Sequence, residues 1–182
     1  MSRIVLITGP KHSGKSSCIK ALGELVDGQT IDLDELVEAQ SGKSPRELYA
    51  IGVESFRKAE ALAFSSVLKT SNPKQQIIAS GGGLIDNSEV MALLSEARAM
   101  QREIIIVYLD VSMETAWQRI VNDGELPVFL NMGNPMGLNP QETHLALHER
   151  RAEAYRKLAD IIIETENKTV MEIAGEISIK LL

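Results

Sequence analysis

The chain has 182 residues, a formal net charge of −6, 44% apolar residues and a single cysteine. This length suits one domain with a sizeable core. The acidic balance, without a long Lys/Arg run, argues against a binder of nucleic acid or membrane surfaces. One cysteine excludes an internal disulfide framework and a cysteine-rich zinc site. No apolar run reaches the roughly 18 residues of a membrane-spanning helix, and no signal-peptide pattern opens the sequence, so we expect a cytoplasmic protein.

The first predicted strand leads into a glycine-containing loop. Residues 3–8 are apolar on both faces of the predicted strand, and Gly9-Pro10-Lys11-His12-Ser13-Gly14-Lys15-Ser16 follows them. The loop reads G-x-x-x-x-G-K-S, and a helical pattern begins at residue 15 and runs to about 26, which is the context that a phosphate-binding loop requires. The glycines allow consecutive N–H groups to point at an anion, and the helix adds the positive end of its dipole.

This loop predicts roles for particular side chains. Lys15 is expected to reach the β- and γ-phosphates of ATP, and Ser16 to ligate Mg²⁺. We expect His12 to point to solvent and Cys18, in the following helix, to be a small core residue. The residues expected to bind the nucleotide are Gly9, Lys11, His12, Ser13, Gly14, Lys15, Ser16 and Ser17.

Strands and helices alternate along the rest of the chain. Further strands are predicted over residues 29–32, 76–79, 103–109 and 161–163, and further helices over 34–40, 45–69, 87–100, 112–121, 140–158 and the C-terminal remainder. This alternation predicts a parallel sheet that is covered by helices on both faces. Because no domain boundary or internal repeat is visible, we treat residues 1–182 as one domain.

Polar residues follow two of the predicted strands. The second strand ends in acidic residues, Asp32 and Asp34, and Ser80 ends the third. Asp32 is placed to hold the water shell of Mg²⁺, because that ion keeps several of its waters, and Ser80 could do likewise. The alternative is that the two aspartates cap the next helix, although capping needs only one of them.

The stretch over about residues 122–140 is rich in Gly, Asn and Pro. It is long for a connector in a compact domain, which indicates a functional or mobile segment. Two histidines, His144 and His148, lie four apart in the helix that follows. Their spacing permits a metal pair, but no third ligand is evident, so we expect surface positions.

Five motifs in order resemble those of the shikimate kinase family, over essentially the whole chain. They are the phosphate loop, Asp32-Leu33-Asp34, Phe56-Arg57-Lys58-Ala59-Glu60, Ile78-Ala79-Ser80-Gly81-Gly82-Gly83, and Arg151 four residues before Tyr155. The resemblance implies a three-layer α/β P-loop kinase fold with a five-stranded parallel sheet in the order 2-3-1-4-5. It places the site at the carboxyl ends of the strands, where ligands bind in open α/β sheets.

The resemblance also implies an activity, the transfer of the γ-phosphoryl group of ATP, with Mg²⁺, to a hydroxyl of a small hydroxylated carboxylic acid. Shikimate is the leading candidate. Lys15, Asp32 and Asp34 would be catalytic, with Asp34 binding the acceptor hydroxyl and able to take its proton. The other implied residues are the carboxylate-binding Arg57 and Arg151, with Arg150 as the alternative to Arg151 and Glu60 holding Arg57, the substrate-binding Gly81, Gly82 and Gly83, and Arg119 at the adenine.

The segment over residues 122–140 departs from the family, whose lid carries an arginine in an Arg-Pro-Leu pattern. Leu126 stands at that position, and no Lys or Arg occurs between Arg119 and Arg150. A cation aimed at phosphoryl charge matters greatly for transfer. Three alternatives follow: Lys11 or Arg119 substitutes for it, the acceptor is a different hydroxylated molecule, or the chain binds nucleotide without efficient transfer. In each case we expect a small-molecule partner, a monomer, and no nucleic acid or membrane.

Overall fold

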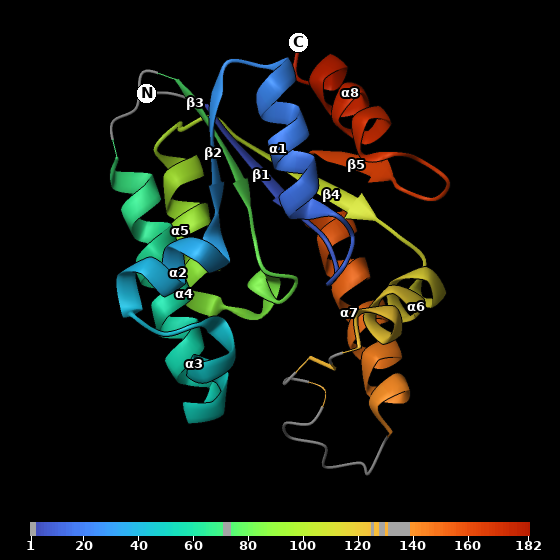
Figure 1. Ribbon diagram of the computed structural model, residues 1–182. Helices are drawn as coiled ribbons and strands as arrows, with labels where there is room; N and C mark the ends of the chain where they lie inside the picture. Colours follow the sequence, from blue (N-terminus) through green and yellow to red (C-terminus); the bar gives the residue numbers. More distant parts are fainter. Residues whose placement is uncertain (1–2, 71–73, 125, 128–129, 131–138) are drawn as a thin grey trace.

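The computed structural model describes residues 3–70, 74–124, 126–127, 130 and 139–182 (Figure 1). No helix in these ranges is long and apolar enough to cross a membrane. The elements in chain order are β1 (Ile4–Thr8), α1 (Lys15–Leu25), β2 (Gly28–Asp32), α2 (Leu33–Ser41), α3 (Pro45–Ile51), α4 (Val53–Lys69), β3 (Gln75–Ala79), the short 3₁₀ helix η1 (Leu84–Asp86), α5 (Ser88–Ala99), β4 (Ile104–Asp110), α6 (Met113–Asp123), α7 (Pro140–Leu158), β5 (Ile161–Glu164) and α8 (Val170–Lys180).

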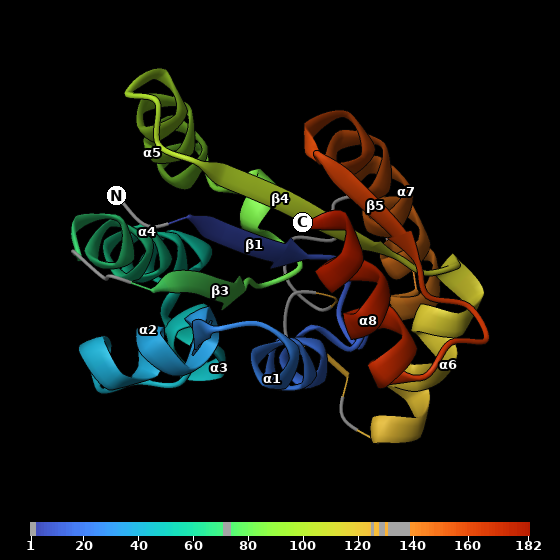
Figure 2. The same ribbon diagram turned by 90° about the horizontal axis from the view of Figure 1, so that it is seen from above.

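The five strands form one parallel sheet in the order β2-β3-β1-β4-β5, which confirms the predicted order. In the register of the sheet, Ile7 of β1 lies beside Ala79 of β3, and Ala79 lies beside Asp32 of β2. The carboxyl ends of these three strands therefore meet at one edge. Figure 2 shows α1 and α8 on one face of the sheet and α5 and α7 on the other.

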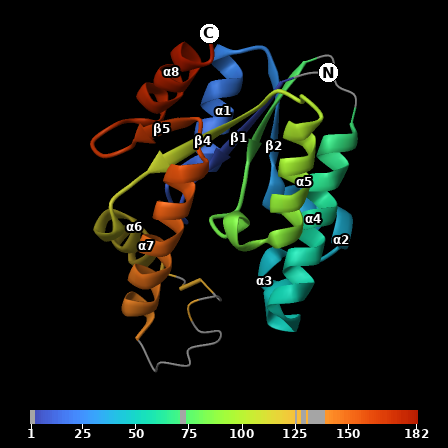
Figure 3. The ribbon, with the colours of Figure 1, turned by 180° about the vertical axis from the view of Figure 1, so that it is seen from behind.

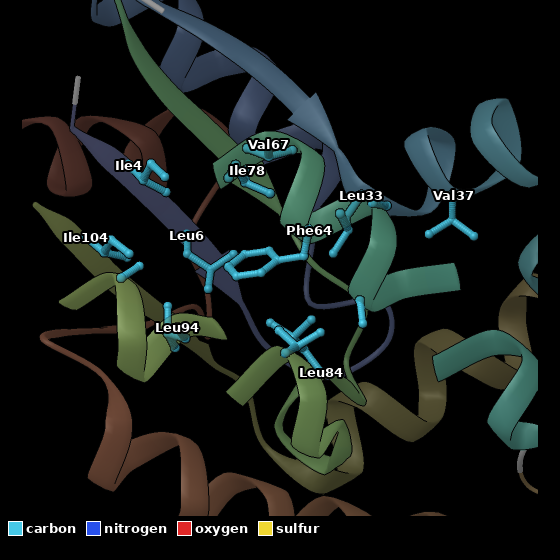
Figure 4. Packing of buried hydrophobic residues seen from close by; sticks show 14 of the residues in the cluster. Ile4, Leu6, Leu33, Val37, Phe64, Val67, Ile78, Leu84, Leu94 and Ile104 are labelled. Carbon is cyan, nitrogen blue, oxygen red and sulfur yellow. The ribbon is translucent and has the colours of Figure 1, made fainter. Parts of the chain in front are cut away.

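Strand β1 is buried on both faces, and its side chains alternate between two cores. Ile4 and Leu6 belong to a cluster with α2, α4 and α5, in which Phe64 is fully buried (Figure 4). Val5 and Ile7 belong to the opposite cluster, with α1 and α8. That cluster includes Cys18, so its predicted core position is confirmed. Each large apolar side chain that is buried in this way stabilises the fold by about 1.5–3 kcal/mol.

A third cluster joins α7 to the sheet behind the phosphate loop (Figure 3). The rings of Tyr108 from β4 and Tyr155 from α7 stack with their centroids 5.4 Å apart. The hydroxyl of Tyr155 accepts a hydrogen bond of 3.1 Å from the backbone N–H of Ile85 in η1. Through this bond, α7 fixes the 3₁₀ turn that follows the glycines after β3.

The helix predicted over residues 45–69 is two helices, so this part of the prediction was wrong. Gly52, with φ of 157° and ψ of 151°, separates α3 from α4. This backbone is extended and cannot continue a helix, and a glycine adopts it without the steric cost of a side chain. The break lets α3 turn back across α4, and the ring of Tyr49 stacks on that of Phe56 at 4.3 Å.

His144 and His148 are buried, which corrects their expected surface positions. Their exposed fractions are 4% and 6%, because this face of α7 packs against α6 and the ring of His144 lies 5.5 Å from that of Trp117. Burial lowers the pKa of His144 to about 4, so the ring is neutral and suits an interior. Within the described ranges, no three His, Cys, Asp or Glu side chains gather as a metal site.

The packing of α4 predicts a large difference between two positions on that helix. Phe64→Ala removes a fully buried ring and should lower the free energy of unfolding by about 3–5 kcal/mol. Leu62→Ala, at a position that is 69% exposed, should change it by less than about 0.5 kcal/mol. Urea unfolding followed by circular dichroism measures both, with Phe64→Leu as the milder variant if Phe64→Ala does not fold. Equal losses at the two positions would contradict this account of the core.

Candidate active site

The candidate site lies where the carboxyl ends of β1, β2 and β3 meet. Ser80, the residue after β3, donates its backbone N–H to the carbonyl of Ile7 in β1 at 3.0 Å. A cavity of about 580 Å³ opens at this edge. Its wall includes Lys11, His12, Gly14, Lys15, Ser16, Ser17, Asp32, Asp34, Ser44, Pro45, Arg46, Tyr49, Phe56, Ser80, Gly81, Gly82, Gly83, Pro127 and Arg151.

The loop after β1 has the backbone of an anion-binding turn. Gly9 and Gly14 have φ of 155° and 90°, which favour glycine, and His12 has φ of 59°. A side chain at Gly9 would come within 2.7 Å of Ser13 Oγ and 2.8 Å of the Leu109 carbonyl oxygen. Gly14 precedes α1 without a side-chain cap, which leaves the first N–H groups of that helix for an anion.

Lys15 turns back over this loop. Its Nζ donates to the carbonyl oxygen of Pro10 at 2.7 Å. Burial lowers the pKa of its ammonium to about 8, against the opposing charges of Asp34 and Asp32. A phosphate placed in the loop would favour the charged form, since an opposite charge raises the pKa of an amine.

The carboxylate of Asp32 accepts hydrogen bonds from two neighbouring residues. One carboxylate oxygen accepts from the backbone N–H of Asp34 at 3.0 Å and caps α2. The other accepts from the hydroxyl of Ser16 at 2.6 Å. Asp32 is thus the helix cap, while its second oxygen and the Ser16 hydroxyl form a pair of hard oxygen donors of the kind that Mg²⁺ prefers.

Asp34, in the first turn of α2, faces the same cavity. Burial and the neighbouring charge of Asp32 raise the pKa of its carboxyl, and Lys15 opposes them. A carboxylate with a raised pKa is a better proton acceptor than an ordinary one. The geometry therefore gives Asp32 and Asp34 different environments, one hydrogen-bonded and one desolvated.

The residues after β3 need to be small. Ser80 is 3% exposed and its hydroxyl lies 3.4 Å from the carbonyl oxygen of Ile7. A Cβ at Gly82 would lie 3.0 Å from the carbonyl oxygen of Gly9, and one at Gly83 would lie 3.1 Å from Arg151 Nη2. The glycines thus allow the chain after β3 to pass close to the phosphate loop and to Arg151.

Arg151, rather than its neighbour Arg150, lies on the wall of the cavity. The Arg151 side chain is 18% exposed, and its Nε donates to Asp86 Oδ2 at 2.8 Å. Arg150 is 60% exposed and pairs with the same carboxylate. Partial burial works to raise the pKa of Asp86, but the hydrogen bond from Arg150 and the charge of Arg151 hold it below its usual value. Asp86 was not predicted, because nothing in the motif after β3 marks it.

Arg57 has a different partner from the one predicted. In the described part of the chain, its Nη1 lies 3.2 Å from Glu54 Oε1 rather than pairing with Glu60. Glu60, which is 1% exposed, accepts instead from Nδ2 of Asn87 at 2.8 Å. Its Oε1 has no hydrogen-bond partner among the described residues. Burial raises the pKa of Glu60 to about 7 in spite of the bond from Asn87.

The predicted adenine-site arginine and the loop histidine lie together at the end of α6. Arg119 Nη1 donates to the carbonyl oxygen of His12 at 3.0 Å. The His12 side chain is only 24% exposed, and its Nε2 lies 3.5 Å from Asp123 Oδ2. The expectation that His12 points to solvent was therefore wrong, because α6 packs its polar end against the loop. Burial and the charge of Lys11 lower the pKa of His12.

Several wall residues were missed by sequence reasoning. Ser44, Pro45, Arg46 and Tyr49 come from the start and face of α3, Phe56 from α4, and Pro127 from the predicted lid. Glu125 and the rest of that lid lie largely outside the described residues. The sequence pattern predicted a helix from residue 45 but not which of its faces lines the cavity. Leu126 lies instead at a separate hollow with Trp117 and Ile120.

The fold and the phosphate loop define a P-loop kinase, and comparison with known proteins identifies its family. Residues 11–182 match the family model described as shikimate kinase. Shikimate kinase from Lactococcus lactis is 32% identical over 174 residues, with 95% of this chain and 94% of that protein covered. Shikimate kinase from Streptococcus gordonii is 33% identical over 177 residues, with 96% of each covered. The chain belongs to the shikimate kinase family.

Solved structures show the same fold. Shikimate kinase from Acinetobacter baumannii, in complex with shikimate, superposes with a TM-score of 0.80 at 24% identity, over 100% of this chain and 93% of that chain. Shikimate kinase from Aquifex aeolicus gives a TM-score of 0.71 at 25% identity, over 98% and 95%. The three-layer architecture with its central parallel sheet is therefore shared over nearly the full length of each protein.

The burial of Glu60 predicts a dependence of stability on pH. The pKa of its carboxyl is about 7 in the folded chain, against 4.5 for an ordinary glutamate side chain, so the folded state keeps a proton that the unfolded state releases. The protonated carboxyl therefore contributes to the free energy of unfolding. This contribution is fully present below about pH 4.5 and is lost as the pH rises through about 7. It amounts to at most about 3 kcal/mol.

The Glu60→Gln variant has no carboxyl at this position. As the pH rises from 5 to 8, which is roughly the window of this titration, its free energy of unfolding should fall less than that of the unaltered chain. Urea unfolding at a series of pH values measures the difference. Glu89→Gln, which removes an exposed carboxylate on α5, is the control and should keep the original slope. Identical slopes for Glu60→Gln and the unaltered chain would contradict the assigned pKa.

Proposed function

We propose that this chain transfers the γ-phosphoryl group of ATP to a hydroxyl group of shikimate. The observation that carries the proposal is one cavity in which the phosphate loop, the Ser16–Asp32 pair, the desolvated Asp34 and Arg151 all meet. Family membership supports ATP as the phosphoryl donor. Phosphoryl transfer needs mainly positioning and charge stabilisation, which these groups can provide.

The phosphate loop binds the donor. Its N–H groups and the start of α1 supply fixed positive dipoles, and Lys15 supplies a charge that can follow the phosphates. In the structure, Lys15 Nζ is held by the carbonyl oxygen of Pro10 at 2.7 Å, inside the loop. Its position and its partial desolvation both favour exchange of this carbonyl for a phosphate oxygen. Arg119 stabilises the loop by donating a hydrogen bond to the carbonyl oxygen of His12.

Ser16, Asp32 and Ser80 have the donor chemistry to hold Mg²⁺. The hydroxyl of Ser16 donates to Oδ2 of Asp32 at 2.6 Å, so these two oxygens lie side by side. Buried Ser80 lines the same cavity. When bound, Mg²⁺ neutralises charge that develops on the phosphoryl oxygens.

Asp34 orients the acceptor and takes its proton. As the hydroxyl oxygen forms its bond to the γ-phosphorus, the bond from that phosphorus to the bridging oxygen of ADP breaks, and the hydroxyl proton passes to Asp34. The raised pKa of its carboxyl matches this task. Arg151 offers two N–H groups to the acceptor's carboxylate, and the glycines after β3 leave room for the substrate beside it. The predicted role of Arg57 would require it to turn from Glu54.

A different hydroxylated acceptor is the second candidate, and the lid sequence favours it. No Lys or Arg occurs between Arg119 and Arg150, and Leu126 stands at the position of the family arginine, against a separate hollow. A panel of hydroxy acids and polyols, assayed in parallel with shikimate, distinguishes the two candidates. The monomeric state and the cytoplasmic location remain predictions.

The first test is acceptor-dependent formation of ADP from ATP, Mg²⁺ and shikimate. Lys15→Ala should lower kcat/KM by at least about 100-fold, because it removes the charge that binds the transferred group. Lys20→Ala, which changes an exposed lysine on the same helix, should leave kcat/KM unchanged. Substantial turnover by Lys15→Ala would refute the role of the loop, and ATP binding without turnover by the unaltered chain would refute the proposed activity.

The second test separates the acceptor chemistry from nucleotide binding. Asp34→Asn keeps the size of the side chain but cannot accept the hydroxyl proton, so kcat should fall by about 100-fold to 10,000-fold. The Kd for ATP, measured by calorimetry, should change little, because the phosphate loop remains intact. Equal losses in turnover and in ATP affinity would count against the role of Asp34 toward the hydroxyl.

A further inference from the structure

The cavity has a source of positive charge that no sequence motif indicates. In the part of the chain that the structure describes, the Lys and Arg residues on its wall are Lys11, Lys15, Arg46 and Arg151. The two lysines belong to the phosphate loop, and Arg151 comes from α7. Arg46 reaches the cavity from α3, on the opposite side from α7 (Figures 1 and 3).

The start of α3 is fixed, which sets the position of Arg46. Ser44 Oγ accepts from the N–H of Glu47 at 3.3 Å, and Glu47 Oε2 accepts from the N–H of Ser44 at 2.8 Å, a reciprocal cap with Pro45 as the first helical residue. Such a cap holds the first turn of a helix in place. Arg46 therefore has a defined backbone although its side chain is exposed.

The same face of α3 carries an aromatic residue of the cavity. Tyr49, three residues after Arg46, lies on that face of the helix, and its ring stacks on Phe56 of α4 at 4.3 Å. Both rings line the cavity, while Leu48 is buried in the core behind them. Arg46 thus stands beside an aromatic wall at the end of the cavity formed by α3 and α4.

Other charged groups lie on this wall. Asp34 faces the cavity, and Arg151 shares the carboxylate of Asp86. An acceptor with a carboxylate brings a further negative charge into this space. A guanidinium meets such a group with paired N–H donors, and its long stem covers the distance from a helix face.

We propose that Arg46 binds the carboxylate of the acceptor from the α3 side, together with Arg151 from α7. Arg46 thereby adds a cation on the acceptor side of the cavity, whereas residues 120–149 contain no Lys or Arg. This inference rests on the proposed function, since it assumes an acceptor that carries a carboxylate. It makes Arg46 a determinant of specificity and assigns it no part in the transfer of the proton or the phosphoryl group.

The test compares Arg46→Ala with Lys43→Ala, an exposed cation just before the same helix that is not part of the described wall of the cavity. Arg46→Ala should raise KM for shikimate about 10-fold to 100-fold, as expected for the loss of a charged hydrogen bond. KM for ATP should stay constant, and Lys43→Ala should behave as the unaltered chain. Arg46→Lys should restore part of the affinity, because it keeps the charge but not the paired donors.

The methyl ester of shikimate separates recognition from a structural effect. The ester lacks the carboxylate charge, so Arg46→Ala should affect its KM far less than that of shikimate. An unchanged KM for shikimate, or an equal loss for acid and ester, would overturn the inference while leaving the proposed function intact. If the unaltered chain shows no turnover, the binding of shikimate is measured by calorimetry instead. Weaker binding by Arg46→Ala than by the unaltered chain would then support the role of Arg46 even though the proposed activity fails. No binding of shikimate by the unaltered chain would overturn both this inference and the proposed function.

Discussion

The parallel register of β1, β2 and β3 is the constraint on which the site depends. It sets Ile7, Ala79 and Asp32 side by side, so the phosphate loop, Ser80 and the acidic end of β2 must emerge at one edge. The strands keep that register because β1 is buried on both faces, with Ile4 and Leu6 in one core and Val5 and Ile7 in the other. A shift of one residue would exchange these faces and would move the acidic end of β2 away from the loop.

Burial then gives each charged group of the site its own environment. Asp32 is hydrogen-bonded to Ser16 and to the start of α2, whereas Asp34 is desolvated and its pKa is raised. Lys15 is held inside its loop with a pKa lowered to about 8. These differences arise from packing rather than from residue type, and they separate the roles proposed for donor binding, metal binding and acceptance of a proton.

Sequence patterns predicted those features that depend on local geometry. The loop motif, the alternation of strands and helices and the resemblance predicted the strand order and the strand ends that carry the phosphate loop and Asp32, because glycine spacing and strand ends can be read from the sequence. Features that depend on contacts between distant elements were missed. Asp86 holds Arg151 across 65 positions, His144 is buried by Trp117 of another helix, and the cavity-facing side of α3 follows from the break at Gly52. None of these contacts is encoded by spacing within one element.

The most direct test of the central claim identifies the product rather than the rate. Phosphorus NMR of a reaction with ATP, Mg²⁺, shikimate and the purified chain should show a new phosphate monoester that accumulates in equal amount with ADP. That result would establish transfer to a hydroxyl of the acceptor within this cavity, with Lys15→Ala as the blank. ADP formed together with inorganic phosphate alone, or no ADP at all, would contradict the account.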